Sequence, residues 1–474
     1  MLEFQVRSKP RTLLIVAVLV GTLLMSFFYT GITPTSAQGP DGTPPAGGGQ
    51  PPDGAGGPPG DGTTTNPVLT ATCGIITLDG EAGASTTDQI YDSAEADSSD
   101  ICVINGGSLT LVNPAITKTG DTSSSDQSSF YGLNAAVLVG PDSSVTITGG
   151  SVTTAGAGTN GVFATGSGSS VTLTDVSIYA VGDGAHAVMA TLGGTMTLNN
   201  VDMITTDVHS GAIATDRGSG TITVTGGTVL TSGQDSPGIY STGIITVSDA
   251  TITATGAESA VIEGANSIIL TNTTLASNLE DKWGVMIYQS FSGDAEGSDG
   301  VFTMTGGSLA HTATTGPLFF VTNSTAYITL SGVEVTAGSG ILVEAGGTDR
   351  WGNSGENGGT VYLTADAQTL TGDLMADNIS TINATLQNRS SLTGSINPDN
   401  TAQAANLTLD GTSTWNVTAD SVLTCLADSG GISDGSVSNI AGNGYTVTYD
   451  SSVCTELGGQ TYALSGGGYL QPAS

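Results

Sequence analysis

A short pattern of alternating apolar and polar residues recurs about every 25 residues through most of this 474-residue chain. The first and third residues of each copy are apolar, and the second is usually Thr. Alternation with a period of two is typical of a strand with one buried face, and a fixed longer spacing is typical of stacked repeats. The eight copies begin at Val145, Val171, Met196, Ile222, Ile245, Ile268, Phe302 and Ile328.

The residue that closes each copy is always Gly, Asn or Asp, and these residues adopt a left-handed backbone at the least cost. We therefore expect a corner with positive φ at every one of these positions. They are Gly149, Asp175, Asn200, Gly226, Asp249, Asn272, Gly306 and Gly332.

Each repeat also holds two further short apolar segments, so three strands complete one coil. A single coil cannot bury its apolar face, whereas stacked coils bury residues such as Ile147 and Leu173 against one another. We predict an all-β right-handed parallel β-helix (β-solenoid) with three short strands per coil, about a dozen coils on this repeat spacing, and capped ends. The expected parts are a signal peptide or anchor at 1–37, a Gly/Pro-rich linker at 38–67, an N-terminal cap and first coils at 68–133, the regular helix at 134–400, and C-terminal coils and cap at 401–474.

The amino terminus has the pattern of an export signal. Basic residues at positions 7, 9 and 11 precede an uncharged apolar stretch, and Thr35-Ser36-Ala37 offers a cleavage site before Gln38. We expect cleavage, with an uncleaved membrane anchor as the alternative. The expected location is extracellular or at the cell surface, with membrane contact only through this segment if it is retained.

Four cysteines, Cys73, Cys102, Cys425 and Cys454, form one local pair near each end of the mature chain. An even count in an exported protein suggests disulfides. Three connectivities are compatible with the sequence. We favour Cys73–Cys102 and Cys425–Cys454, because each bond would staple one end of a solenoid.

Acidic residues outnumber basic ones by 42 to 8, which gives a net charge of −34. Such a surface repels nucleic acid and anionic lipid, so neither is an expected partner. We expect no cofactor and no metal site, with weak binding of divalent cations along the acidic surface as the alternative. His186 and His209 fall in successive corners, but no third ligand accompanies them.

Three segments near the carboxyl end resemble the passenger domains of pertactin-like bacterial autotransporter adhesins. They are Leu392-Thr-Gly-Ser-Ile396, the stretch 407–423, and Tyr462-Ala-Leu-Ser-Gly-Gly-Gly-Tyr-Leu470. The resemblance covers about residues 374–470 by motif, and it implies a secreted right-handed β-helix that serves adhesion. We expect the translocator barrel of that family to be absent, because the sequence ends at Ser474.

Polysaccharide lyases and hydrolases share this fold, so an enzyme is the first alternative. Arg217 beside Asp216 is the best candidate base, although a surface ion pair is the simpler interpretation. Glu263 and Glu344 are expected three coils, or about 14 Å, apart, whereas glycosidases need carboxyl groups about 5–9.5 Å apart. We predict no catalytic residue.

Two basic–aromatic pairs, Lys282-Trp283 and Arg350-Trp351, fall in what read as longer loops near 279–300 and 346–359. Such a pair could hold a sugar ring by stacking and by cation–π contact. The alternative is that each Trp folds back over its coil. These four residues are the candidate ligand contacts.

A column of outward Thr residues raises ice binding as a further alternative, although Thr is also favoured on exposed strand faces. The expected ladder is Thr146, Thr172, Thr197, Thr223, Thr246, Thr303 and Thr329. The function that we expect first is adhesin-like surface display without catalysis. Its expected partner is an extracellular polysaccharide or another cell-surface protein.

Overall fold

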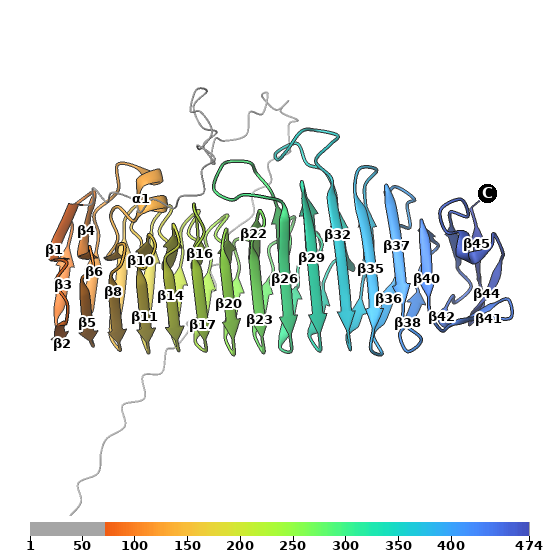
Figure 1. Cartoon of the computed structure of the whole chain (residues 1–474), viewed down its shortest axis with the longest axis horizontal. Helices are drawn as coiled ribbons and strands as arrows, with labels where there is room; N and C mark the ends of the chain where they lie inside the picture. The colour runs from red at the N-terminus through yellow and green to blue at the C-terminus, as the bar shows by residue number, and fades with distance from the viewer. Residues whose placement is uncertain (1–71, 474) are drawn as a thin grey trace, which may run out of the picture. The chain divides into compact units, whose positions relative to one another are not determined.

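The computed structural model describes residues 72–473 of the chain. They form an all-β parallel solenoid with three strands per coil, as predicted, and the solenoid has about 16 turns. The coils stack along one axis (Figure 1). The expected signal segment 1–37 and linker 38–67 lie outside the described residues.

Sheet A has 12 strands, each from the first part of a coil. Its strands are β1 (Thr72–Asp79), β4 (Ser98–Ile104), β7 (Val137–Val139), β10 (Val162–Thr165), β13 (Val188–Thr191), β16 (Ile213–Thr215), β19 (Ile239–Ser241), β22 (Ala260–Glu263), β25 (Val285–Tyr288), β28 (Phe319–Thr322), β31 (Ile341–Ala345) and β34 (Asp373–Ala376).

Sheet B has 14 strands and carries the repeated pattern. Its strands are β2 (Ala84–Thr87), β5 (Ser108–Val112), β8 (Ser144–Thr148), β11 (Ser170–Thr174), β14 (Thr195–Asn199), β17 (Thr221–Thr225), β20 (Ile244–Ser248), β23 (Ser267–Thr271), β26 (Asp299–Thr305), β29 (Ser324–Ser331), β32 (Gly359–Asp366), β35 (Thr381–Gln387), β37 (Ala404–Leu409) and β40 (Cys425–Asp428).

Sheet C has 10 strands and follows the corner. Its strands are β3 (Ile90–Ser93), β6 (Ala115–Lys118), β9 (Ser151–Ala155), β12 (Ser177–Val181), β15 (Asp202–Thr205), β18 (Thr228–Thr231), β21 (Thr251–Ala254), β24 (Thr274–Ser277), β27 (Ser308–His311) and β30 (Glu334–Ala337).

A fourth sheet, D, closes the carboxyl end. Its order is β33 (Thr369–Thr371), β36 (Ser391–Gly394), β38 (Thr414–Val417), β42 (Ser436–Ala441), β44 (Tyr462–Ser465), β45 (Tyr469–Pro472), β43 (Thr446–Tyr449) and β39 (Ser421–Leu423), and β41 (Ile432–Ser433) pairs with β42. Two short helices, α1 (Ser125–Tyr131) and η1 (Thr455–Leu457), complete the described chain.

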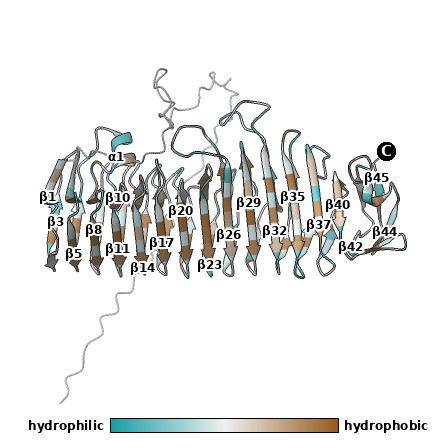
Figure 2. Ribbon diagram, viewed as in Figure 1, coloured by the Kyte–Doolittle hydropathy of each residue, from teal (hydrophilic) through white to brown (hydrophobic). Residues whose placement is uncertain are grey.

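The core is the column of apolar side chains that the alternation predicted. Ile147, Leu173, Leu198, Val224 and Val247 occupy matching registers in neighbouring strands of sheet B and are at most 1% exposed. Figure 2 shows the apolar residues concentrated along the strands. Each coil therefore buries its apolar side on the next one.

The eight corner residues all have positive φ, between 48° and 69°, so the predicted left-handed corner is confirmed at every position. Polar side chains link some successive corners. Asn200 donates from Nδ2 to Oδ1 of Asp175 at 2.7 Å, and Asn272 donates to Asp249 at 3.4 Å. The corner column thus combines a backbone requirement with hydrogen bonds between coils.

Sheet A departs from the expected pattern because its strands are buried on both faces. The outward column Leu138, Phe163, Met189 and Ala214 is at most 1% exposed. Helix α1 and two loops, 289–298 and 346–358, emerge from the same side of the solenoid (Figure 1). These segments interrupt the repeat and supply the cover that a regular coil lacks.

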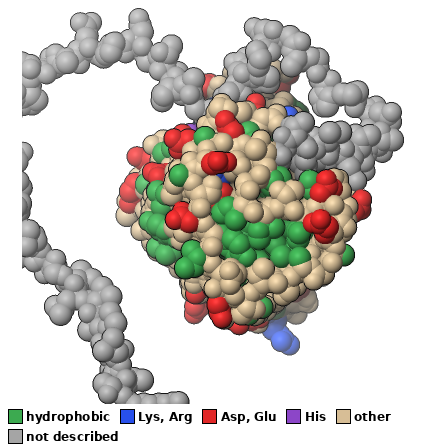
Figure 3. Space-filling view, turned by 90° about the vertical axis from the view of Figure 1, so that its left-hand side faces the viewer, with side chains coloured by type: hydrophobic (Ala, Val, Ile, Leu, Met, Phe, Trp, Pro, Cys, Tyr) green, Lys and Arg blue, Asp and Glu red, His purple; other side chains and the backbone are tan. Residues whose placement is uncertain are grey.

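The two ends of the solenoid differ. Strands β1 to β6 form two regular coils, and apolar side chains gather on the face seen from this side of the described solenoid (Figure 3). At the other end, β41 to β45 include antiparallel pairs that break the coil path. Both predicted disulfides are present, Cys73–Cys102 and Cys425–Cys454.

The solenoid has about 16 turns, more than the expected dozen, and coils extend through the expected ranges before 134 and after 400. In the range 72–473, no helix has the length and apolar character that crossing a membrane requires.

Replacement of Gly332 tests whether the corner position requires a residue that tolerates positive φ, without a steric clash from the new side chain. Its φ is +62°, and an added Cβ would meet no atom within 4 Å. We expect Gly332→Val to lower the free energy of unfolding by about 1–2 kcal/mol, the cost of a left-handed backbone in a residue with a Cβ. Urea unfolding should show Gly332→Asn close to wild type, and equal losses in both variants would contradict the corner requirement.

Candidate functional site: an aromatic and carboxylate patch on sheet A

The candidate site lies on the outer face of sheet A, between loops 289–298 and 346–358. The outward column of this sheet continues through Val261, Met286 and Phe320, which occupy matching registers in β22, β25 and β28. They are between 3% and 6% exposed. The rings of Trp283, Tyr288 and Trp351 pack against this apolar base. We call the base and these three rings the sheet A patch.

Aromatic rings from three segments meet over this base. The Trp283 ring stacks on Phe320 with centroids 4.3 Å apart and planes 11° apart. The Trp351 ring lies 4.9 Å from Tyr288 and 6.5 Å from Trp283. The two tryptophans that are far apart in sequence are therefore neighbours, and both are partly exposed.

The two predicted basic partners have different environments. Lys282 Nζ lies 2.7 Å from Asp235 Oδ1 and 3.7 Å from Glu258 Oε1, so two carboxylates hold it. The guanidinium carbon of Arg350 lies 4.7 Å from the centroid of Trp351, and its side chain is exposed. Of the two, Arg350 is the cation placed to meet a ligand.

The expected loop 279–300 is not one loop. Strand β25 occupies residues 285–288 because Val285 and Ile287 continue the buried columns of sheet A. Trp283 therefore sits in the corner just before a regular strand, and the inserted residues follow that strand. The Trp351 side is a true insertion between β31 and β32.

Glu263 anchors loop 289–298 beneath the aromatic rings. Its carboxylate accepts hydrogen bonds from Tyr240 Oη at 2.5 Å, from Tyr288 Oη at 2.7 Å and from Ser290 Oγ. The Glu263 side chain is 1% exposed. Three donors from two strands and one loop satisfy this buried charge, as a buried carboxylate requires.

A second carboxylate, Asp294, ties the same loop to helix α1 through Arg217. Arg217 Nη2 lies 2.9 Å from Asp294 Oδ1, and its guanidinium carbon lies 3.8 Å from the Phe130 ring centroid. The adjacent Asp216 instead accepts a hydrogen bond from the Arg217 backbone N–H. The expected ion pair of Arg217 is thus formed with Asp294 and not with Asp216.

Burial raises the pKa of Asp216 well above its usual value, and repulsion from Asp294 adds to the shift. Burial also raises the pKa values of Tyr240 and Tyr288, so both remain hydroxyl donors to Glu263. The two tyrosines therefore hold the Glu263 carboxylate in place through their hydroxyl groups.

Of the other candidate residues, Glu344 borders the base of the sheet A patch, and the histidines are paired in other coils. Glu344 shares a register with Phe320 and so continues the outward column of Val261, two residues off the register of Glu263, and the two glutamates do not end equivalent strands. His186 Nδ1 is paired with the Gly211 carbonyl, and His209 Nδ1 with Asp183. Within residues 72–473, no group of three or more His, Cys, Asp or Glu residues could hold a metal ion.

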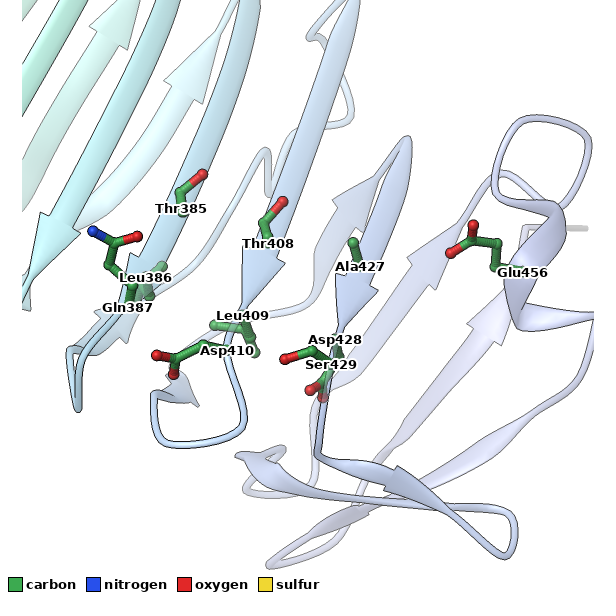
Figure 4. Close-up of a pocket in the computed structure, with 10 residues that line it drawn as sticks. All are labelled: Thr385, Leu386, Gln387, Thr408, Leu409, Asp410, Ala427, Asp428, Ser429 and Glu456. Atoms are coloured by element: carbon green, nitrogen blue, oxygen red, sulfur yellow. The ribbon is translucent and has the colours of Figure 1, made fainter.

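A shallow hollow lies beside the last strands of sheet B, lined by residues of β35, β37 and β40 and by Glu456 (Figure 4). Its carboxylates already accept backbone hydrogen bonds. Asp410 accepts from Asn388 N–H at 2.7 Å, and Asp428 accepts from Gly431 N–H at 2.8 Å. These bonds stabilise turns, and Asp428 Oδ2 is left without a hydrogen-bond partner among residues 72–473.

Sequence reasoning missed Tyr240, Tyr288, Phe320 and Phe291. The first three occupy outward positions in sheet A strands, where an apolar or aromatic residue signals that something covers it. Phe291 lies in loop 289–298 with 70% exposure and a φ of +59°. An exposed aromatic ring with a left-handed backbone is a feature that often marks functional loops.

Comparison of the chain with protein-family models, with curated proteins and with solved structures found no match. The interpretation of the sheet A patch therefore rests on its own geometry.

The pKa of Asp216 gives a pH-dependent prediction. Because the pKa of Asp216 is raised in the folded state, its protonated carboxyl group favours the folded state fully at pH values below the unfolded pKa of about 4. This stabilisation is lost as the pH rises through the folded pKa. We expect Asp216→Asn, which keeps the acceptor for Arg217 N–H, to raise the urea midpoint at pH 8. The difference from wild type should shrink as the pH approaches that of the unfolded carboxyl, and a pH-independent difference would contradict the assignment.

Proposed function

We propose that this protein is an exported surface-display solenoid that binds an extracellular polysaccharide through the sheet A patch, without catalysis. The observation that carries the proposal is the convergence of Trp283, Trp351 and Arg350 on one partly exposed surface. Aromatic faces stack on the apolar faces of sugar rings, and a nearby cation or hydroxyl fixes their orientation.

The composition supports a polysaccharide over a nucleic acid or an anionic membrane. With 42 acidic residues against 8 basic ones, the protein repels polyanions. The disulfides fit an oxidising, extracellular setting. The resemblance of residues 374–470 to pertactin-like adhesins supports the adhesive interpretation.

The hydrogen bonds of the carboxylates favour binding over catalysis. Glu263 is saturated by three hydroxyl donors beneath the loop, and Asp294 is paired with Arg217. A general acid or nucleophile must reach the substrate. We assign these carboxylates the role of holding loop 289–298 in position.

Substitutions in the aromatic patch test this proposal on the secreted full-length chain. A glycan array first identifies the bound polysaccharide, and titration then gives its Kd. We expect Trp351→Ala to weaken binding by about tenfold, equivalent to about 1.4 kcal/mol, because a stacking face is lost. Arg350→Ala, at an exposed side chain, should weaken it by a smaller factor without changing the unfolding midpoint.

Tyr327→Ala is the matched control. Tyr327 stacks on Tyr362 with centroids 5.1 Å apart on sheet B, and it is 42% exposed. Its loss should leave Kd unchanged. Equal effects at Tyr327 and Trp351 would place binding elsewhere, and release of new reducing ends from the polysaccharide would favour the enzyme alternative.

A second candidate function, ice binding, is favoured by the length of the Thr column on sheet B. The predicted ladder residues share one register, and the column extends beyond them. From β5 to β37 it contains Thr110, Thr146, Thr172, Thr197, Thr223, Thr246, Ile269, Thr303, Thr329, Thr364, Thr385 and Thr408. Hydroxyl groups repeated at the strand spacing of about 4.8 Å offer a regular template for ordered water.

Thermal hysteresis measurements test this second candidate. We expect the wild-type chain to separate the freezing and melting points, and Thr223→Lys to reduce the gap because a long charged side chain disrupts the column. Thr251→Lys places the same charge on an exposed position of sheet C and is the control. Absence of hysteresis in the wild type at high concentration removes the candidate.

A further inference from the structure

A buried lysine faces a buried aspartate inside the second coil. Lys118, at the end of β6, and Asp100, in β4, both have side chains that are 0% exposed. Lys118 Nζ lies 3.9 Å from Asp100 Oδ1. In later coils the position equivalent to Lys118 holds small or neutral residues such as Thr154 and Ala180. The pair is therefore an exception in an otherwise repetitive core.

The pair is poorly satisfied as an ion pair. Among residues 72–473, neither oxygen of the Asp100 carboxylate has a donor in full hydrogen-bond geometry, and the Ser93 side chain is a donor near enough to lower its pKa. Lys118 Nζ donates to the Glu95 backbone carbonyl instead. A buried ion pair offsets its desolvation cost only when hydrogen bonds satisfy the remaining lone pairs. Here those bonds are missing on the acidic side.

Burial favours the neutral forms of both groups. Burial raises the pKa of Asp100 to about 6, although Lys118 opposes the shift. Burial likewise lowers the pKa of Lys118 despite the neighbouring Asp100. Transfer of one proton from the ammonium to the carboxylate gives a neutral amine beside a carboxylic acid, and these are the forms that can react.

We propose that Lys118 and Asp100 form an intramolecular amide cross-link. The Nζ lone pair attacks Cγ of the Asp100 carboxyl group, and a bond forms between nitrogen and carbon. The bond from Cγ to the hydroxyl oxygen breaks, and the hydroxyl leaves with one amine proton as water. No oxidant or further reactant is needed. Nζ lies 3.9 Å from Oδ1 of this carboxyl group, and attack requires it to approach Cγ to about 3–3.5 Å.

The product suits this environment better than the reactants. The amide carries no charge, so the desolvation of two ions is avoided. Its remaining N–H can keep the Glu95 carbonyl as acceptor, as Nζ does now. The cross-link would join sheets A and C in the second coil, two residues from Cys102 and its disulfide. The solenoid would then be covalently cross-linked in the second of its described coils.

Mass spectrometry of the folded, full-length secreted protein tests the cross-link directly. After reduction of both disulfides and denaturation, we expect most molecules to be lighter than their sequence by one water. Proteolysis should yield one branched peptide in which Lys118 is joined to Asp100. Lys118→Arg keeps a cation beside the carboxylate but should show the full sequence mass, because a guanidinium remains protonated.

Two separate linear peptides with a free Lys118 amine would overturn the proposal and leave a buried ion pair. A loss of water at another Asp, without a bridge to Lys118, would overturn it as well. The peptide map of the wild-type chain decides the question even if Lys118→Arg fails to fold. None of these outcomes depends on what the sheet A patch binds.

Discussion

The structure depends on one constraint, which is that a coil of about 25 residues can bury its apolar side only against another coil. The strands must therefore keep register from coil to coil, and the corner must turn at the same place each time. The Ile and Leu columns of sheet B satisfy the first condition, and the Gly, Asn and Asp corners with positive φ satisfy the second. Any functional site must be added without breaking either condition.

The repeat made most of the fold predictable. The alternation of apolar and polar residues predicted the buried column of sheet B, and the corner residues predicted a positive φ at eight positions. The cysteine spacing gave both disulfides, because parallel coils bring residues about one repeat apart close together. These features depend on interactions between neighbouring coils, so a local sequence pattern records them.

The outer face of sheet A was less predictable, because its cover comes from segments that do not repeat. The two Trp residues of the patch belong to different coils, and nothing in either local sequence indicates that Trp283 stacks on Phe320 or that Trp351 packs on Tyr288. Arg217 was expected to pair with its sequence neighbour, yet its partner Asp294 comes from a distant insertion. Insertions between A and B strands thus create a local, irregular surface on a regular scaffold.

The uniform corner has a consequence for how such a protein can change in length. Because each corner needs only a Gly, Asn or Asp in one conformation, a duplicated coil would fit between two existing coils with its own corner already correct. Each added coil would extend the solenoid by about 4.8 Å, while the loops of the patch stay on their own strands. Duplication of a coil on the N-terminal side of the patch would therefore change the distance between the patch and the first described coil in fixed increments.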